Sequence, residues 1–159
     1  MTFTLTSNDI TDGGILPDAQ VQARGNISPH LRWSGVPDGT KSFAVTCFDP
    51  DAPTGSGFWH WTVANIPADV RELLEDASSG GLPRGAVEGR TDFGSPGYGG
   101  AAPPPGHGPH RYVFTVFAVD VPQLDLTPDN SGAVFGFNLH FHTLAKASLT
   151  ATYENSGEG

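Results

Sequence analysis

Asp49–Trp61 reads Asp-Pro-Asp-Ala-Pro-Thr-Gly-Ser-Gly-Phe-Trp-His-Trp, and this stretch joins two apolar, β-branched segments. The segment before it, Ser42–Phe48, is typical of a strand buried on both faces. The segment after it, Trp59–Ile66, is rich in aromatic and β-branched residues and predicts a second strand. We therefore expect neighbouring strands that bring Asp49 and His60 to the same end.

The loop between these two strands should be stiff. Pro50 and Pro53 fix φ and remove two backbone donors, so this backbone neither continues a sheet nor flexes freely. Gly55 and Gly57 allow the chain to turn back. A stiff loop with a carboxylate at one lip and an imidazole at the other predicts one wall of a pocket.

Length and composition favour one β-rich domain. The chain has 159 residues, with 21 Gly and 14 Pro spread throughout, which suits many strands joined by irregular loops. Ten Phe, three Trp and three Tyr supply bulky core side chains. We expect a single domain over residues 1–154 and a flexible C-terminal tail over residues 155–159.

The charge pattern limits the partners of the chain. A net charge of -9 with eight scattered Lys and Arg residues disfavours nucleic acid. The N-terminal residues show no secretory signal, and no apolar run is long enough for a membrane span. We therefore expect a cytoplasmic protein with no integral membrane association. The single Cys47 excludes an internal disulfide, and it is interpreted as core packing.

Other segments complete the expected architecture, which is mainly β with one or two short helices. Residues 78–108 form a long Gly/Pro-rich loop whose aromatic residues predict that it packs down. This loop leads to a strand in which His110 and Tyr112 share one face at the opening end. Expected strands are Phe3–Thr6, Leu31–Ser34, Val113–Val119 and Lys146–Tyr153.

Two helical segments are expected. Ala68–Leu74 predicts one or two helical turns, and Thr127 is a good N-cap for a longer helix with Pro128 at its first position. Phe135 would then lie away from the face made by the apolar residues at helical spacing. Together with Leu139 it predicts an apolar patch for a second copy of the chain. The residues at helical spacing are Val134, Phe137, Phe141 and Leu144.

Polar residues at the strand ends predict a site for a small oxyanion. Imidazole N–H and phenol O–H groups are donors, and backbone N–H groups at Gly100–Ala102 and Gly106 can approach closely. Asp49 would orient a histidine or bind loop N–H groups, whereas Asp51 fits a local turn role. If the imidazoles donate to the anion, affinity should fall as pH rises through about 6.5. The constellation is Asp49, Asp51, His60, His110 and Tyr112.

The position of His110 at the mouth of its strand also predicts that its replacement spares fold stability. Four histidines, His110 among them, also allow a metal-binding interpretation. However, no acidic ligand follows them at a spacing that completes a recognisable metal site. Core or interface histidines are the favoured interpretation. The histidines concerned are His107, His110, His140 and His142.

Two motifs resemble the signatures of the phosphatidylethanolamine-binding protein family, also called Raf kinase inhibitor-like proteins. The first is Asp49-Pro-Asp-Ala-Pro53 followed by His60-Trp61. The second is Gly99-Gly-Ala-Ala-Pro-Pro-Pro-Gly106 leading into His110-Arg-Tyr112. The small bacterial branch is also matched by Thr91-Asp-Phe-Gly94, Gly97-Tyr98, and Gly136-Phe-Asn138 with His140-Phe-His142.

This resemblance implies a β-sandwich-like fold of two antiparallel sheets, a small pocket for phosphate-like groups, and a homodimer. It favours a non-enzymatic binding or regulatory protein that takes a phosphorylated ligand head group or a phosphorylated side chain of a partner. No cofactor and no metal are expected. The alternatives are a metal-assisted hydrolase using the histidines and a protein–protein inhibitor of a kinase or protease. The family's pocket residues fall on Asp49, Ala52, Pro53, His60, Pro104, His110 and Tyr112.

Overall fold

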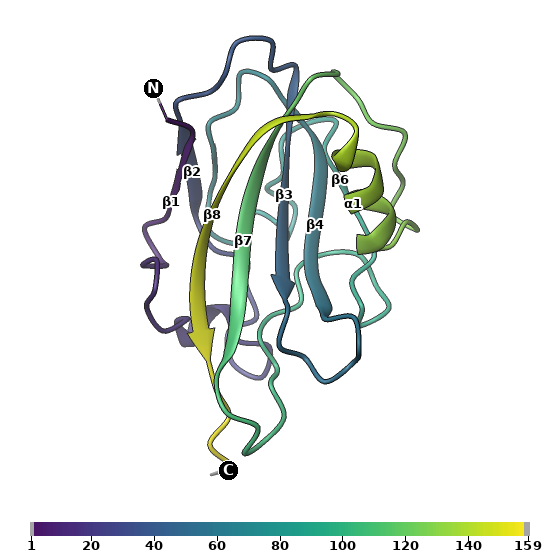
Figure 1. Ribbon diagram of the computed structural model, residues 1–159. Coiled ribbons are helices and arrows are strands. Elements are labelled where there is room, and N and C mark those ends of the chain that lie inside the picture. Colours follow the sequence, from purple (N-terminus) through teal and green to yellow (C-terminus); the bar gives the residue numbers. More distant parts are fainter. Residues whose placement is uncertain (1, 158–159) are drawn as a thin grey trace.

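The computed structural model describes residues 2–157, which form two antiparallel sheets and one α-helix (Figure 1). The mainly β fold is confirmed. The larger sheet has the order β6-β4-β3-β7-β8, and the smaller sheet has the order β1-β2-β5. The larger sheet consists of β3 (Ser42–Asp49), β4 (Phe58–Pro67), β6 (Val87–Glu88), β7 (His110–Val119) and β8 (Thr143–Tyr153). The smaller sheet consists of β1 (Thr4–Thr6), β2 (Leu31–Ser34) and β5 (Glu72–Leu73).

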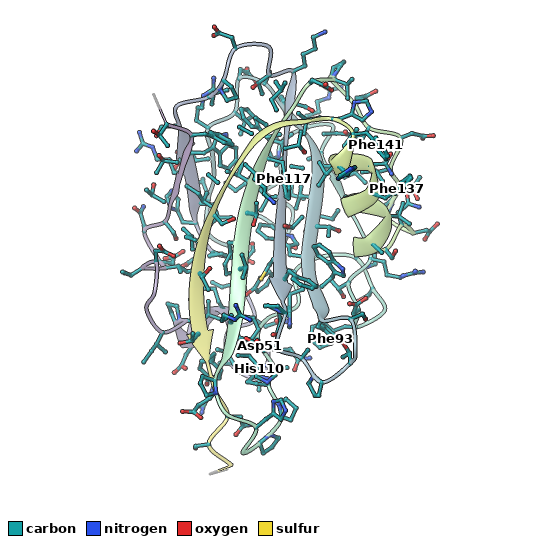
Figure 2. The ribbon with its side chains drawn as sticks, viewed as in Figure 1. Asp51, Phe93, His110, Phe117, Phe137 and Phe141 are labelled. Carbon is teal, nitrogen blue, oxygen red and sulfur yellow. The ribbon has the colours of Figure 1, made fainter. Side chains whose placement is uncertain are left out.

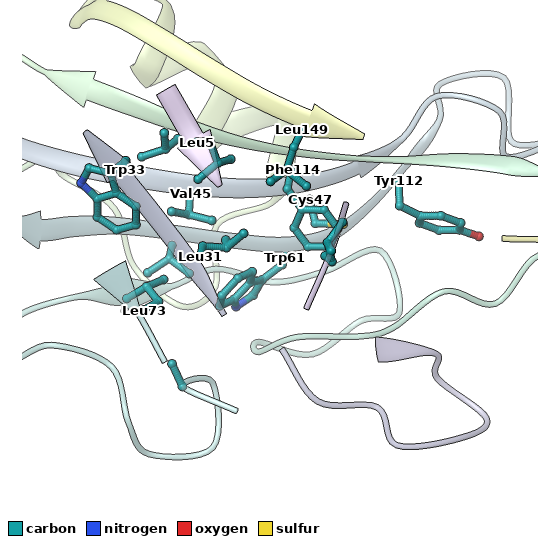
Figure 3. Close-up of a cluster of buried hydrophobic side chains, with 14 of the residues drawn as sticks. Leu5, Leu31, Trp33, Val45, Cys47, Trp61, Leu73, Tyr112, Phe114 and Leu149 are labelled. Atoms are coloured by element: carbon teal, nitrogen blue, oxygen red, sulfur yellow. The ribbon is translucent and has the colours of Figure 1, made fainter. Parts of the chain in front are cut away.

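Strand β3 lies at the centre of the larger sheet and is covered on both faces, as its apolar sequence predicts. Phe43, Val45 and Cys47 join the core cluster that fills the space between the two sheets (Figure 3). Ala44 belongs to a second cluster on the opposite face. Burial on both faces removes β3 from water and fixes the position of the strand end at Asp49.

The helix α1 (Gly132–His140) covers that opposite face, and it starts later than the sequence predicts. Thr127 is not its N-cap. The N–H of Thr127 donates to Oδ1 of Asn130, and the N–H of Asn130 donates to the carbonyl of Thr127, so these residues form a turn. Ser131 is the N-cap, because its hydroxyl accepts the N–H of Val134.

The orientation of α1 is the reverse of the prediction. Phe135 and Leu139 are buried against the sheet, whereas Phe137 is 68% exposed and Phe141 is 64% exposed. A Cβ at Gly132 would overlap the ring of Trp59, so glycine lets this end of the helix approach β4 closely. The apolar patch is therefore real, but it lies on the face that was expected to be buried. The residues of this exposed helix patch are Val134, Phe137, Phe141 and Leu144.

The segment Ala68–Leu74 is not helical. Its end forms β5, in which Leu73 pairs with Leu31 of β2, and Leu74 is 66% exposed. The helical expectation is wrong because the edge of β2 takes up this short segment as a third strand, and pairing across a sheet overrides weak local helical preference. Within residues 2–157 no helix is long and apolar enough to cross a membrane.

The C-terminal end passes beside the 78–108 loop. The N–H of Gly106 in this loop donates to the carbonyl of Asn155 at 2.8 Å. The predicted flexible tail of residues 155–159 is only partly covered, because residues 158–159 lie outside the described residues. The start of that tail is therefore in contact with the loop that approaches β7.

Candidate functional site

A cavity of about 230 Å³ lies at the end of the larger sheet where β3 stops and β4 and β7 begin. The labelled side chains of Phe93 and His110 mark this end of the sheet (Figure 2). Its walls come from three strand ends, the β3–β4 loop and the 78–108 loop. The lining residues are Asp49, Ala52, Pro53, Thr54, Phe58, His60, Phe93, Ala102, Pro104 and His110.

Asp49 and His110 form a buried pair at the base of this cavity. The pairing of β3 with β7 aligns the two strands, and Nδ1 of His110 lies 2.7 Å from Oδ2 of Asp49. The other carboxylate oxygen, Oδ1, accepts the N–H of Asp51 at 2.7 Å. Asp49 thus has both expected roles, because it orients a histidine and binds a loop N–H group.

The second ring nitrogen of His110 contacts another histidine. Nε2 of His110 lies 2.6 Å from Nδ1 of His107, which is exposed on the 78–108 loop. Because Nδ1 of His110 faces a carboxylate, it carries a hydrogen, and one of the two facing nitrogens must carry the hydrogen of the His107–His110 contact. A chain of hydrogen bonds therefore runs from buried Asp49 to solvent.

His60 presents a different atom to the cavity. Its Nδ1 lies 2.8 Å from the carbonyl oxygen of Gly99, so this nitrogen donates a hydrogen. The side chain is almost fully enclosed, and burial lowers the pKa of His60 against the opposing influence of the Gly99 carbonyl and Asp49. The imidazole is therefore neutral near pH 7, with an unprotonated Nε2. That atom has no hydrogen-bond partner among the described residues and is not fully enclosed, so it faces the cavity.

Aromatic rings close the side of the cavity next to His60. Phe58 and Phe93 contact each other with ring centroids 4.7 Å apart, and Phe58 lies 4.9 Å from His60. The backbone of Asp92 holds this segment against β4, because its N–H donates to the carbonyl of Trp59. A Cβ at Gly99 would overlap the ring of Phe93, so glycine is required where the carbonyl meets His60.

The nearest cation is turned away from the cavity. Arg111 follows His110 along the strand and forms a two-point ion pair with Asp51, with distances of 3.0 Å and 2.8 Å. The Arg111 guanidinium lowers the pKa of Asp51 to about 2. The local turn role expected for Asp51 is wrong, because its carboxylate also accepts the backbone N–H of Arg111 and ties the loop to β7. Neither Lys nor Arg lines the cavity.

Six of the seven predicted pocket residues line this one cavity, and Tyr112 does not. Tyr112 is buried with its ring 5.3 Å from that of His60, and its hydroxyl has no partner among the described residues. Figure 3 shows this hydroxyl pointing away from the neighbouring core side chains. Burial raises the pKa of Tyr112, so the hydroxyl stays protonated.

Three of the four backbone donors expected from the Gly/Pro-rich loop are used within the fold. The N–H of Gly100 donates to Asn26, that of Ala101 to Gln20, and that of Gly106 to Asn155. The sequence reasoning also did not assign several lining residues to the site. Phe58 and Phe93 could have been assigned to the cavity from the sequence, because each is an aromatic residue beside a predicted motif. The unassigned lining residues are Thr54, Phe58 and Phe93, whereas Ala102 was expected only as a backbone donor.

One expectation about the histidines changes. His110 is 1% exposed and bonded to a buried carboxylate, so it does not lie at an open strand end, and we now expect its replacement to lower stability. His142 contacts Asp120 at 2.9 Å, far along the chain from the cavity residues. Within residues 2–157, no three His, Cys, Asp or Glu side chains are placed to hold a metal ion together.

Comparison with known proteins gives consistent matches over nearly the whole chain. The model of the phosphatidylethanolamine-binding protein family matches residues 6–154. UPF0098 protein YbhB of Escherichia coli (strain K12) is 56% identical over 156 residues, which cover 94% of this chain and 98% of the relative. UPF0098 protein YbcL of the same strain is 51% identical and covers 96% of this chain and 87% of the relative.

Solved structures agree with these matches. The crystal structure of E. coli YbcL, described as a new member of the mammalian PEBP family, has a TM-score of 0.93 at 51% identity and covers 96% of this chain and 98% of its own. A putative homolog from Chlamydia trachomatis D/UW-3/CX has a TM-score of 0.82 at 31% identity, covering 96% and 97%. The strands that carry the cavity therefore belong to a fold that these relatives share.

Proposed function

The chain belongs to the phosphatidylethanolamine-binding protein family, and we propose that it is a non-enzymatic binding protein whose cavity takes a phosphate-like group. The observation that carries this proposal is the convergence of Asp49, His60 and His110 at one cavity of about 230 Å³. A cavity of this size fits the head of a small ligand or one modified side chain of a partner.

The polar groups of the cavity support recognition of an oxyanion rather than of an apolar ligand alone. One of the two facing nitrogens of His107 and His110 carries a hydrogen, and it can donate this hydrogen to a ligand oxygen instead of to the other ring. Asp49 stabilises a hydrogen on the far side of His110 and so keeps this ring in a fixed orientation. The cavity holds no fixed cation, so affinity for a free anion should be modest.

The description of the family names a phospholipid with a phosphoryl head group, which makes O-phosphorylethanolamine a suitable probe. Isothermal titration should give saturable binding to the wild-type protein. Ala52→Phe, which places a ring in the cavity, should abolish binding, while Ala68→Phe at an exposed turn should leave it unchanged. Equal binding by both variants, or no binding by the wild type, would overturn the proposed function.

We further propose that a second copy of the chain covers the exposed helix patch. Among the described residues, the hydrogen bonds of the outer edge of β8 go to residues 12–16, at Thr150 and Thr152. The part of this edge nearest Leu144 is therefore open, and it is continuous in sequence with Phe141 of the patch. An open strand edge beside apolar side chains suits pairing with an identical edge.

The cytoplasmic location expected from the sequence stays a prediction.

A further inference from the structure

His60 sets which oxyanions the cavity can accept. Its Nδ1–H is used by the carbonyl of Gly99, so the atom that remains for a ligand is Nε2, which is an acceptor. Asp49 lines the same cavity, and both of its carboxylate oxygens already accept hydrogen bonds, from His110 and from the N–H of Asp51. An oxyanion without a hydrogen offers only acceptors, and its oxygens would meet the Nε2 lone pair of His60 with no hydrogen between them.

A ligand oxygen that carries a hydrogen removes this conflict. An O–H group can donate to Nε2 of His60, while an unprotonated oxygen of the same ligand accepts the hydrogen held between His107 and His110. Arg111 cannot offset an acceptor–acceptor contact, because its guanidinium is held outside the cavity by Asp51. The cavity therefore requires both a donor and an acceptor from its ligand.

Building on the proposed function, we propose that the cavity recognises an oxyanion that carries at least one hydrogen, such as the monoanion of a phosphate monoester. It discriminates against oxyanions of the same charge that carry none, namely sulfate esters and phosphodiesters. This selectivity separates the possible phosphoryl ligands by chemistry. In its monoanionic form, which predominates below the second phosphate pKa of about 6, a phosphorylated side chain, a free head group or inorganic phosphate carries a P–O–H group. The head of an intact diacyl phospholipid is a diester and carries none at any pH.

Three small probes isolate the hydrogen from charge and shape. At about pH 6, roughly half of the methyl phosphate is a monoanion with one O–H, because the second phosphate pKa is about 6, and its affinity is calculated for that form. Methyl sulfate and dimethyl phosphate are monoanions without an O–H. Titrations followed by NMR should show methyl phosphate binding at least about tenfold more tightly than either, since a missing partner leaves a cavity acceptor unpaired.

The control variants exchange one ring for another. His60→Phe removes the acceptor but keeps an aromatic ring beside Phe58 and Phe93, and the preference should fall to about one. His142→Phe makes the same exchange at a histidine outside the cavity and should retain the preference. If His60→Phe does not fold, long-range ¹H–¹⁵N NMR of the wild type decides the point, because an Nε2 that carries hydrogen at pH 7 would overturn the inference.

The results of the titrations test the selectivity separately from the proposed function, which is binding of a phosphate-like group. Equal binding of all three probes, or tighter binding of methyl sulfate, overturns the selectivity while the cavity remains an oxyanion site. Absence of binding by methyl phosphate, methyl sulfate and dimethyl phosphate overturns the proposed function itself.

Discussion

Nδ1 of His60 lies 2.8 Å from the carbonyl oxygen of Gly99, and this contact directs the remaining nitrogen of the ring into the cavity. From the sequence, His60 was expected to donate to an anion. The tautomer that this contact requires makes Nε2 an acceptor, because the carbonyl takes the only hydrogen of the neutral ring. The Asp49–His110 pair lines the same cavity. The cavity therefore combines an acceptor with an imidazole that a carboxylate orients.

The first prediction concerns the pH dependence of folding. Burial lowers the pKa of His60 in the folded protein, so the unfolded chain binds this proton more readily. At pH values above about 6.5, the histidine pKa in the unfolded chain, His60 does not lower the free energy of unfolding. As the pH falls below about 6.5, the free energy of unfolding decreases progressively, until the pH is below the pKa of His60 in the folded protein. Urea unfolding between about pH 5 and 8 should therefore show a slope that is shallower in His60→Gln. An unchanged slope in His60→Gln would contradict the assignment.

The second prediction separates the two members of the histidine pair. His110→Ala leaves the buried Asp49 carboxylate without its partner and should cost roughly 3–5 kcal/mol of unfolding free energy. His107→Ala removes an exposed ring and should stay within about 0.5 kcal/mol. Phe114→Ala, in the core, should cost a similar 3–5 kcal/mol by forming a cavity. Equal stability of His107→Ala and His110→Ala would mean that the buried pair does not stabilise the fold.

The third prediction concerns assembly. Phe141→Glu places a charge on the exposed helix patch and should convert a dimer to a monomer without lowering the melting temperature by more than about 2 °C. Phe135→Glu should instead unfold the protein, because Phe135 is fully buried between α1 and the larger sheet. Light scattering at micromolar concentration measures the first effect. A monomeric wild type would remove the proposed dimer.

The fold was predictable from the sequence where the local residue pattern agreed with the tertiary packing. Ser42–Phe48 is apolar throughout and becomes the central strand, and Pro50 with Pro53 end it at Asp49. The helix was placed too early because Thr127-Pro128 is a good start signal in isolation. Only the structure shows Asn130 closing that segment into a turn and Ser131 capping the helix instead.

The cavity was predictable in its residues but not in its hydrogen bonding. The sequence places Asp49, His60 and His110 at the ends of strands, and adjacent strands bring them together. Which nitrogen of each ring faces the cavity depends on contacts with Gly99 and His107, both on the long loop. Loop geometry of this kind has no periodic signal in the sequence, so the change of His60 from donor to acceptor could not be foreseen.

Binding of a phosphoryl group in this cavity is measured most directly at the histidine ring nitrogens. Long-range ¹H–¹⁵N NMR spectra should be recorded while O-phosphorylethanolamine is added. We predict that the ring signals of His60 and His110 shift together and saturate, while those of His30 and His142, which pair with carboxylates elsewhere, do not move. Unchanged signals of His60 and His110, or equal shifts at His30, His60, His110 and His142, would contradict it.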